Sequence, residues 1–171
     1  MKPIPLAYLI TFTCYGTRLH GDASGSVDRE HNAYGSSFLS PNSIRVASEQ
    51  SRAKQRPYSM NSLQRKAVLG AVMEICLYRG WSLLAIHVRS QHVHLVVAGE
   101  DAPEKIMEDA KKYASRALNR AVKDSNNRRR WARHGSTRYL WKPDAVGAAI
   151  HYVVREQGEP MAVWEKPDAL V

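Results

Sequence analysis

The chain has 171 residues, of which 44% are hydrophobic, so it can bury the core of one domain and is too apolar to be disordered. Lysine and arginine number 25 against 16 acidic residues, giving a formal net charge of +9. The sequence contains no run of 18 apolar residues and no signal-peptide core, which predicts a cytoplasmic protein without a membrane partner. Cys14 and Cys76 have no metal-ligand or redox spacing and are expected to be buried, reduced thiols.

The positive charge is concentrated in one part of the chain. Residues 102–142 hold twelve lysines and arginines against four acidic residues, which accounts for almost the whole net charge. A clustered excess of this size is typical of proteins that bind the phosphate backbone of nucleic acids. The alternative is a protein that is merely basic, and the clustering argues against it.

The first part of the chain predicts one strand followed by a long insertion. Residues 6–15 are rich in aromatic and β-branched side chains and predict a central strand. Residues 16–57 contain four glycines and no sustained periodicity, so we expect a long loop with one helical turn within residues 42–50. His20 and Asp22 lie in this loop, where we expect them to be solvated rather than catalytic.

The middle of the chain predicts a helix and a hairpin. Residues 59–79 have a helical period, with Ser59 or Asn61 as the N-cap. Residues 81–88 and 92–98 then predict two paired strands.

The last part of the chain adds two helices around another strand. Pro103 begins a helix with an apolar stripe, in which Tyr113 is expected to belong to the core. A strand is predicted within residues 133–142 and a final helix from Asp144 to Gln157. The chain as a whole, residues 1–171, predicts a single α+β domain with a ferredoxin-like split βαβ fold. It would have a four-stranded antiparallel sheet, two helices on one face and an appended C-terminal helix.

Two histidines lie on the second hairpin strand. Side chains alternate along a strand, so His92 and His94 project from one face while Val93 and Leu95 can be buried on the other. Imidazoles about 7 Å apart along a strand can share one transition-metal ion. Alone the pattern is weak, since two polar residues on an open sheet face would look the same.

The final helix supplies groups that could complete a reactive site. Tyr152 and Glu156 are four residues apart and therefore lie one above the other on the helix. If this helix covers the sheet face opposite the other two helices, Tyr152 approaches His92 and His94. A tyrosine can attack a phosphodiester and form a covalent link, while a divalent ion stabilises the added charge. Two histidines and one carboxylate or amide would hold that ion.

Four motifs resemble a known family. They are TFTCYGTRLHGD at 11–22, QHVHLVV at 91–97, HGSTRYLW at 134–141 and AIHYVVREQG at 149–158. These motifs resemble the single-tyrosine transposases of the HUH endonuclease superfamily, of the insertion-sequence and REP-associated types. The resemblance implies a bacterial, nucleoid-associated enzyme that cuts and rejoins single-stranded DNA through a 5′-phosphotyrosine intermediate.

The resemblance also implies roles for individual residues. His92 and His94 would bind Mg²⁺ or Mn²⁺, and Tyr152 would be the nucleophile. The third ligand would lie one turn after the tyrosine, at Glu156, with Gln157 as the alternative. Whether Tyr152 acts on its own subunit's histidines or across a homodimer stays open.

The DNA partner would be a single strand folded into a hairpin near the cut. The residues expected to bind it are Lys111, Lys112, Arg116, Arg120, Arg128, Arg129, Arg130, Arg133 and Arg138. A non-catalytic nucleic-acid-binding regulator on the same fold is the alternative. A metal-dependent hydrolase of small phosphates is disfavoured because it needs no basic cluster.

Overall fold

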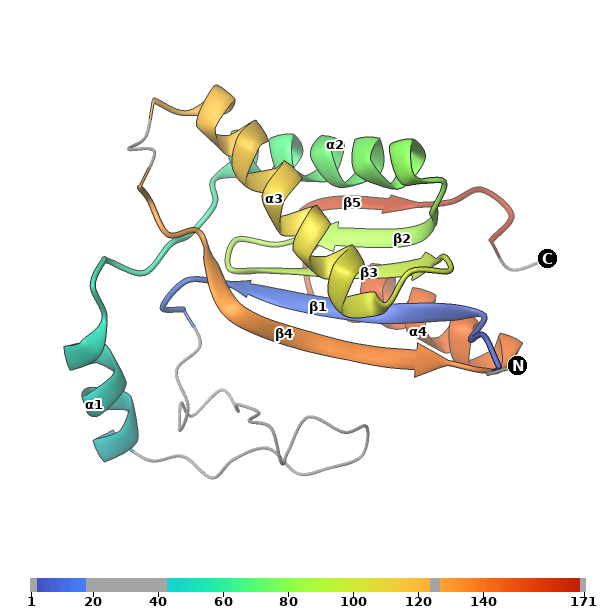
Figure 1. The fold of residues 1–171 in the computed structure, drawn as a ribbon, viewed down its shortest axis with the longest axis horizontal. Helices are drawn as coiled ribbons and strands as arrows, with labels where there is room; N and C mark the ends of the chain where they lie inside the picture. Colours follow the sequence, from blue (N-terminus) through green and yellow to red (C-terminus); the bar gives the residue numbers. More distant parts are fainter. Residues whose placement is uncertain (1–2, 18–42, 124–126, 170–171) are drawn as a thin grey trace.

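The computed structural model describes residues 3–17, 43–123 and 127–169, so His20 and Asp22 lie outside the described residues (Figure 1). The elements follow in chain order as β1 (Ala7–Cys14), α1 (Ser43–Arg52), α2 (Ser62–Arg79), β2 (Ser82–Val88), β3 (His92–Ala98), α3 (Pro103–Ala121), β4 (Trp131–Leu140), α4 (Pro143–Arg155) and β5 (Ala162–Glu165). Within these ranges, no helix combines the length and the apolar character needed to cross a membrane.

The strands form one antiparallel sheet in the order β4-β1-β3-β2-β5. The α+β class and the antiparallel sheet are confirmed, but the predicted four-stranded sheet is wrong by one strand. The additional strand, β5, follows α4 and pairs with β2, so that Ala85 lies opposite Glu165 and Val88 opposite Ala162. Pairing with β5 satisfies backbone groups of β2 that would otherwise form a sheet edge.

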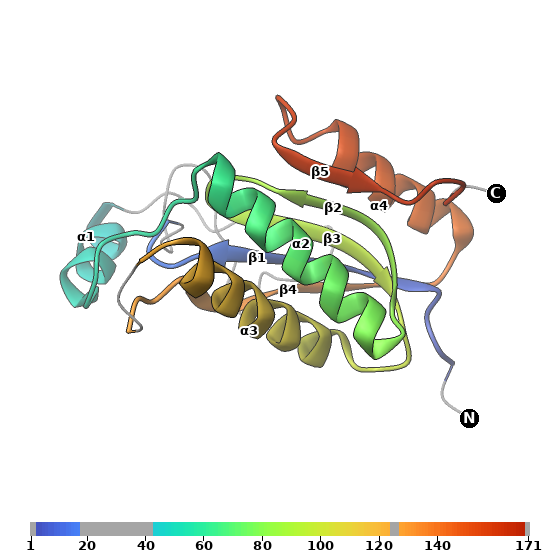
Figure 2. The ribbon, with the colours of Figure 1, turned by 90° about the horizontal axis from the view of Figure 1, so that it is seen from above.

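The sheet separates two apolar cores. On one face, α2 and α3 lie side by side and cover alternate residues of the central strands, such as Ile10, Phe12 and Leu95 (Figure 2). On the opposite face, α4 packs Ile150 and Val153 against a smaller core built on all four longer strands. The alternation of side chains along β3 therefore directs its even-numbered residues, including both histidines, toward α4.

A capping box determines where helix α2 begins. Of the two candidate caps, Asn61 is the N-cap: its side chain accepts from the Gln64 amide, and the Gln64 side chain accepts from the Asn61 amide. The helix ends at Arg79, and the C-cap Gly80 has a φ of 73°, in the left-handed region that favours glycine.

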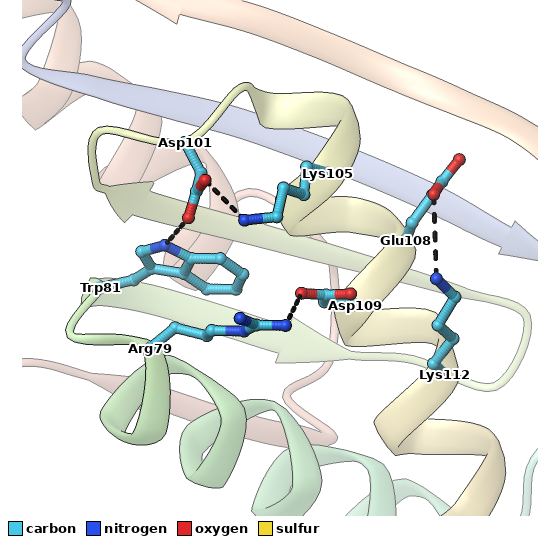
Figure 3. A network of polar contacts seen from close by, with 7 residues as sticks. All are labelled: Arg79, Trp81, Asp101, Lys105, Glu108, Asp109 and Lys112. Carbon is cyan, nitrogen blue, oxygen red and sulfur yellow. Dashed lines mark hydrogen bonds and ion pairs between the residues drawn. The ribbon is translucent and has the colours of Figure 1, made fainter.

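A polar network joins the end of α2 and the start of β2 to α3 (Figure 3). The Trp81 indole donates to Asp101 Oδ2 over 3.0 Å, and Lys105 donates to the other oxygen over 2.6 Å. Both hydrogen bonds lower the pKa of the Asp101 carboxyl. The Arg79 guanidinium lies 2.9 Å from Asp109 Oδ2, as an ion pair rather than an aligned hydrogen bond. This network is on the face of the sheet away from α4, where the Arg79–Asp109 pair links α2 to α3.

Candidate active site

The two histidines of β3 lie together on the α4 face. Their ring centroids are 4.7 Å apart, with an interplanar angle of 74°. His94 is buried, whereas His92 is half-buried at the start of the strand. Pairing with β1 places Thr11 opposite His94 and Thr13 opposite His92, and both histidines lie on β3, the middle strand of the sheet.

Tyr152 reaches this pair from α4. The buried face of α4, formed by Ile150, Val153 and Val154, docks on the sheet, which leaves Tyr152 on the flank of the helix. Tyr152 is 39% exposed, and its ring centroid lies 5.7 Å from that of His94 in an edge-to-face arrangement. A partly exposed phenol beside two imidazoles could meet a phosphate that arrives from solvent.

Thr11 orients one of the two imidazoles. Its Oγ1 lies 2.7 Å from His94 Nδ1, within hydrogen-bond distance. A ring held at Nδ1 would bind a metal through Nε2. Hydrogen bonds of this kind fix the orientation of metal-binding histidines and tune their affinity. Thr11 was not among the predicted site residues, although it begins the first of the four motifs that resemble the transposase family.

The predicted third ligand is engaged elsewhere. The Glu156 carboxylate lies 2.8 Å from His151 Nδ1, and both side chains are exposed. Gln157 donates to the Tyr152 carbonyl over 3.1 Å. Among the described residues, no three His, Cys, Asp or Glu side chains come close enough to hold a metal ion. The structure thus brings His92, His94 and Tyr152 together without assembling Glu156 with them.

A third histidine, which is completely buried and was not among the predicted site residues, lies beside the pair. His87 on β2 is opposite His94 in the strand register and has no exposed surface. Its Nδ1 is 3.0 Å from the Val153 carbonyl, and its Nε2 accepts from the Met161 amide over 3.0 Å. Burial lowers the pKa of His87. The sequence predicted that residues 81–88 and 92–98 pair, but it did not predict this register or the docking of α4 on which the hydrogen bonds of His87 depend.

Lys111 does not have the exposed position expected of a DNA-binding residue. Its ammonium group donates to the carbonyls of Ala132 and His134 on β4 and lies 5.7 Å from the centroid of the Phe12 ring. Burial lowers the pKa of Lys111 to about 8. The amphipathic period of α3 predicted an outward lysine, but β4 packs beside that flank and its carbonyls bind the side chain.

Arg130 is also part of the folded interior. It is 3% exposed and donates to the Tyr58 hydroxyl over 2.6 Å and to Asn119 Oδ1 over 2.8 Å. Its neighbour Arg128 donates to Gln55 and to the Pro57 carbonyl. These contacts hold residues 127–130 against residues 55–58, so Arg130 cannot reach DNA in this conformation.

The other predicted basic residues fall on different surfaces. Lys112, Arg116 and Arg120 are exposed on α3, across the sheet from Tyr152. Arg129 and Arg133 are exposed near the start of β4, the end of the sheet that holds His92. Arg138 lies opposite Leu9, which packs toward α4, so its side chain is on the histidine face.

The fold and this site define an α+β protein in which a helix tyrosine faces a histidine pair on the sheet. A family model described as "Transposase IS200 like" matches residues 51–143, more than half of the chain. The chain belongs to this IS200-like transposase family. Among solved structures it is similar to a REP-associated tyrosine transposase bound to a REP hairpin, at 10% identity and a TM-score of 0.50, over 90% of this chain and 67% of that one. A search of curated proteins found no match.

Proposed function

We propose that this protein is a metal-dependent endonuclease and strand-transfer enzyme for single-stranded DNA, with Tyr152 as its nucleophile. The observation that carries the proposal is the 5.7 Å separation of the Tyr152 and His94 rings on one open flank of α4. Membership in a transposase family supports the same reaction. Because both rings belong to one chain, we propose that the tyrosine acts on its own subunit's histidines.

The reaction follows from the chemistry of a phenol and a phosphodiester. The deprotonated Tyr152 oxygen attacks the phosphorus in line, the bond to the 3′ oxygen breaks, and the 5′ phosphate becomes attached to the tyrosine. The departing 3′ oxygen takes up a proton. The phosphotyrosine retains the energy of the ester, so a free 3′ hydroxyl can reverse the step and join a new end.

His92 and His94 fit as two ligands of a divalent ion, Mg²⁺ or Mn²⁺. When bound, the ion would neutralise charge on the non-bridging phosphate oxygens. We propose that Glu156 or Gln157 supplies the third ligand. Glu156 would first have to leave His151, a change that costs little free energy because both side chains are exposed.

The DNA partner is proposed from the basic surface and from the relative. The similar solved protein is bound to a REP hairpin, and the same class of DNA, a hairpin with unpaired flanks, suits this chain. Of the residues expected to bind DNA, Arg129 and Arg133 are at the end of the sheet that holds His92, and Arg138 is on the histidine face. Lys112, Arg116 and Arg120 would require the DNA to extend around the edge strand β4.

One assay tests the proposal. The protein is incubated with end-labelled DNA hairpins that have randomised unpaired flanks, with and without Mn²⁺ or Mg²⁺, and then denatured. We expect a denaturant-resistant protein–DNA adduct that requires the metal. The adduct should retain a label at the 3′ end of the DNA, because the fragment with the 5′ phosphate at the cut is the one attached to the tyrosine. Hairpin binding without an adduct would instead support a non-catalytic regulator, a function favoured by the Glu156–His151 pairing.

A further inference from the structure

We propose that His87 is a positioning residue that fixes Tyr152 and the segment after it relative to the histidine pair. This inference rests on the proposed function of Tyr152. His87 is completely buried in β2, and both of its ring nitrogens bind backbone groups that come from the α4–β5 region. Neither nitrogen is directed at DNA, so its part in the reaction would be indirect.

The two backbone partners determine the protonation state of the ring. The Val153 carbonyl can only accept a hydrogen bond, so Nδ1 must carry the proton. The Met161 amide can only donate, so Nε2 must be the acceptor. A neutral imidazole with its proton on Nδ1 satisfies both at once. No aliphatic side chain could do so, and two buried backbone groups would lose their partners.

The location of these bonds connects them to Tyr152. Val153 directly follows Tyr152 in the last turns of α4, and Met161 directly precedes β5. His87 itself lies opposite His94, the imidazole that Tyr152 approaches. One side chain therefore ties the tyrosine's own stretch of helix to the strand that borders the proposed metal site.

The two hydrogen bonds of His87 also lie on either side of the segment between α4 and β5. Residues 156–160 lie between the two groups that His87 binds, and they include Glu156 and Gln157. The apolar contacts of Ile150 and Val153 hold α4 on the sheet but are not directional. A hydrogen bond to one particular carbonyl fixes the position of the helix along the sheet.

Two conservative variants can separate the two bonds. The amide nitrogen of His87→Asn can replace Nδ1 and donate to Val153, while the longer His87→Gln can replace Nε2 and accept from Met161. His87→Ala removes both bonds. Ile86→Ala is the matched control, because Ile86 is equally buried in β2 but faces α2 and α3.

Three readouts are measured on the full-length protein. Hydrogen exchange of the Met161 amide reports the bond to Nε2. The rate of adduct formation with a saturating labelled DNA hairpin reports the placement of Tyr152, and the hairpin affinity reports DNA binding. Misplacing a reacting group by about 1 Å can cost about 100-fold in rate, which sets the expected scale.

We expect His87→Ala to slow adduct formation about 100-fold while hairpin affinity stays within about threefold. His87→Asn should recover most of the rate of adduct formation but leave the Met161 amide exchanging fast. His87→Gln should keep the Met161 amide exchanging slowly but recover little of the rate. Ile86→Ala should lose stability without losing rate. A wild-type rate in His87→Ala, or equal effects of His87→Ala and Ile86→Ala on rate, would overturn the inference. Absence of any adduct with the wild-type protein would overturn the proposed function, whereas slow Met161 exchange in His87→Ala would overturn the hydrogen bonds themselves.

Discussion

The ring of Tyr152 meets the imidazole of His94 edge to face, with 5.7 Å between the centroids and 75° between the planes. The tyrosine comes from α4 and the histidine from β3, and the two elements meet because α4 covers the face of the sheet that α2 and α3 leave open. A phosphate placed beside the tyrosine would therefore lie within reach of the histidine pair.

Tyr152→Phe should abolish the denaturant-resistant adduct while leaving hairpin affinity within about threefold. Phenylalanine keeps the ring that packs on His94 but has no oxygen to attack phosphorus. Tyr113→Phe is the control, because Tyr113 packs against the core beneath α3, on the far face of the sheet. Adduct formation measured by denaturing gel compares the two. An adduct that survives Tyr152→Phe and is lost in Tyr113→Phe would contradict the assignment.

The sequence predicted those parts of the fold that depend on local patterns. The alternation of β3 and the capping of α2 at Asn61 need only a few neighbouring residues to be recognised. β5 could not be predicted in this way, because it has four residues and owes its existence to pairing with β2, far away in the chain.

The positions of side chains likewise depend partly on local periods and partly on tertiary contacts. The periods of a strand and a helix predict that His92 and His94 share one face of β3 and that Tyr152 lies beside the apolar face of α4, whereas their approach also requires α4 to dock on that face. The burial of Arg130 depends on Tyr58, which reaches it only in the folded chain. The hydrogen bonds of His87 likewise require α4 to be docked, so its sequence position alone carried little information.

Thr11→Val should weaken binding of the metal ion at the histidine pair. Valine has nearly the shape of threonine but cannot bond His94 Nδ1, so the imidazole loses the contact that orients it. Loss of such a contact typically costs about 10- to 100-fold in metal affinity or activity. The Mn²⁺ concentration that gives half-maximal adduct formation should therefore rise by at least about tenfold. Thr11→Ser should restore it, and Thr13→Val, opposite His92, should change it little.

Arg129→Gln should affect DNA binding, whereas Arg130→Gln should affect the stability of the fold. Arg129 is exposed, so its loss should weaken hairpin binding and flatten the dependence of affinity on salt. Arg130 is buried against Tyr58 and Asn119, so its loss should lower the free energy of unfolding by about 1–3 kcal/mol. Salt titrations of binding and urea unfolding measure the two effects. A folded, fully stable Arg130→Gln protein with weakened binding would show that this guanidinium contacts DNA.

Lys111 should give the stability of the protein a distinctive dependence on pH. Burial lowers the pKa of Lys111 from 10.5 to about 8, so between these values the unfolded chain binds a proton that the folded chain has released. The free energy of unfolding should therefore rise with pH across this window, relative to a Lys111→Met variant. Burial raises the pKa of the Cys14 and Cys76 thiols to about 12, which lowers the free energy of unfolding as the pH rises above 9. This effect is the same in both proteins, so it cancels in the comparison. Urea unfolding at pH 7, 8, 9 and 10 measures the difference, and parallel curves for the two proteins would show that Lys111 keeps its ordinary pKa.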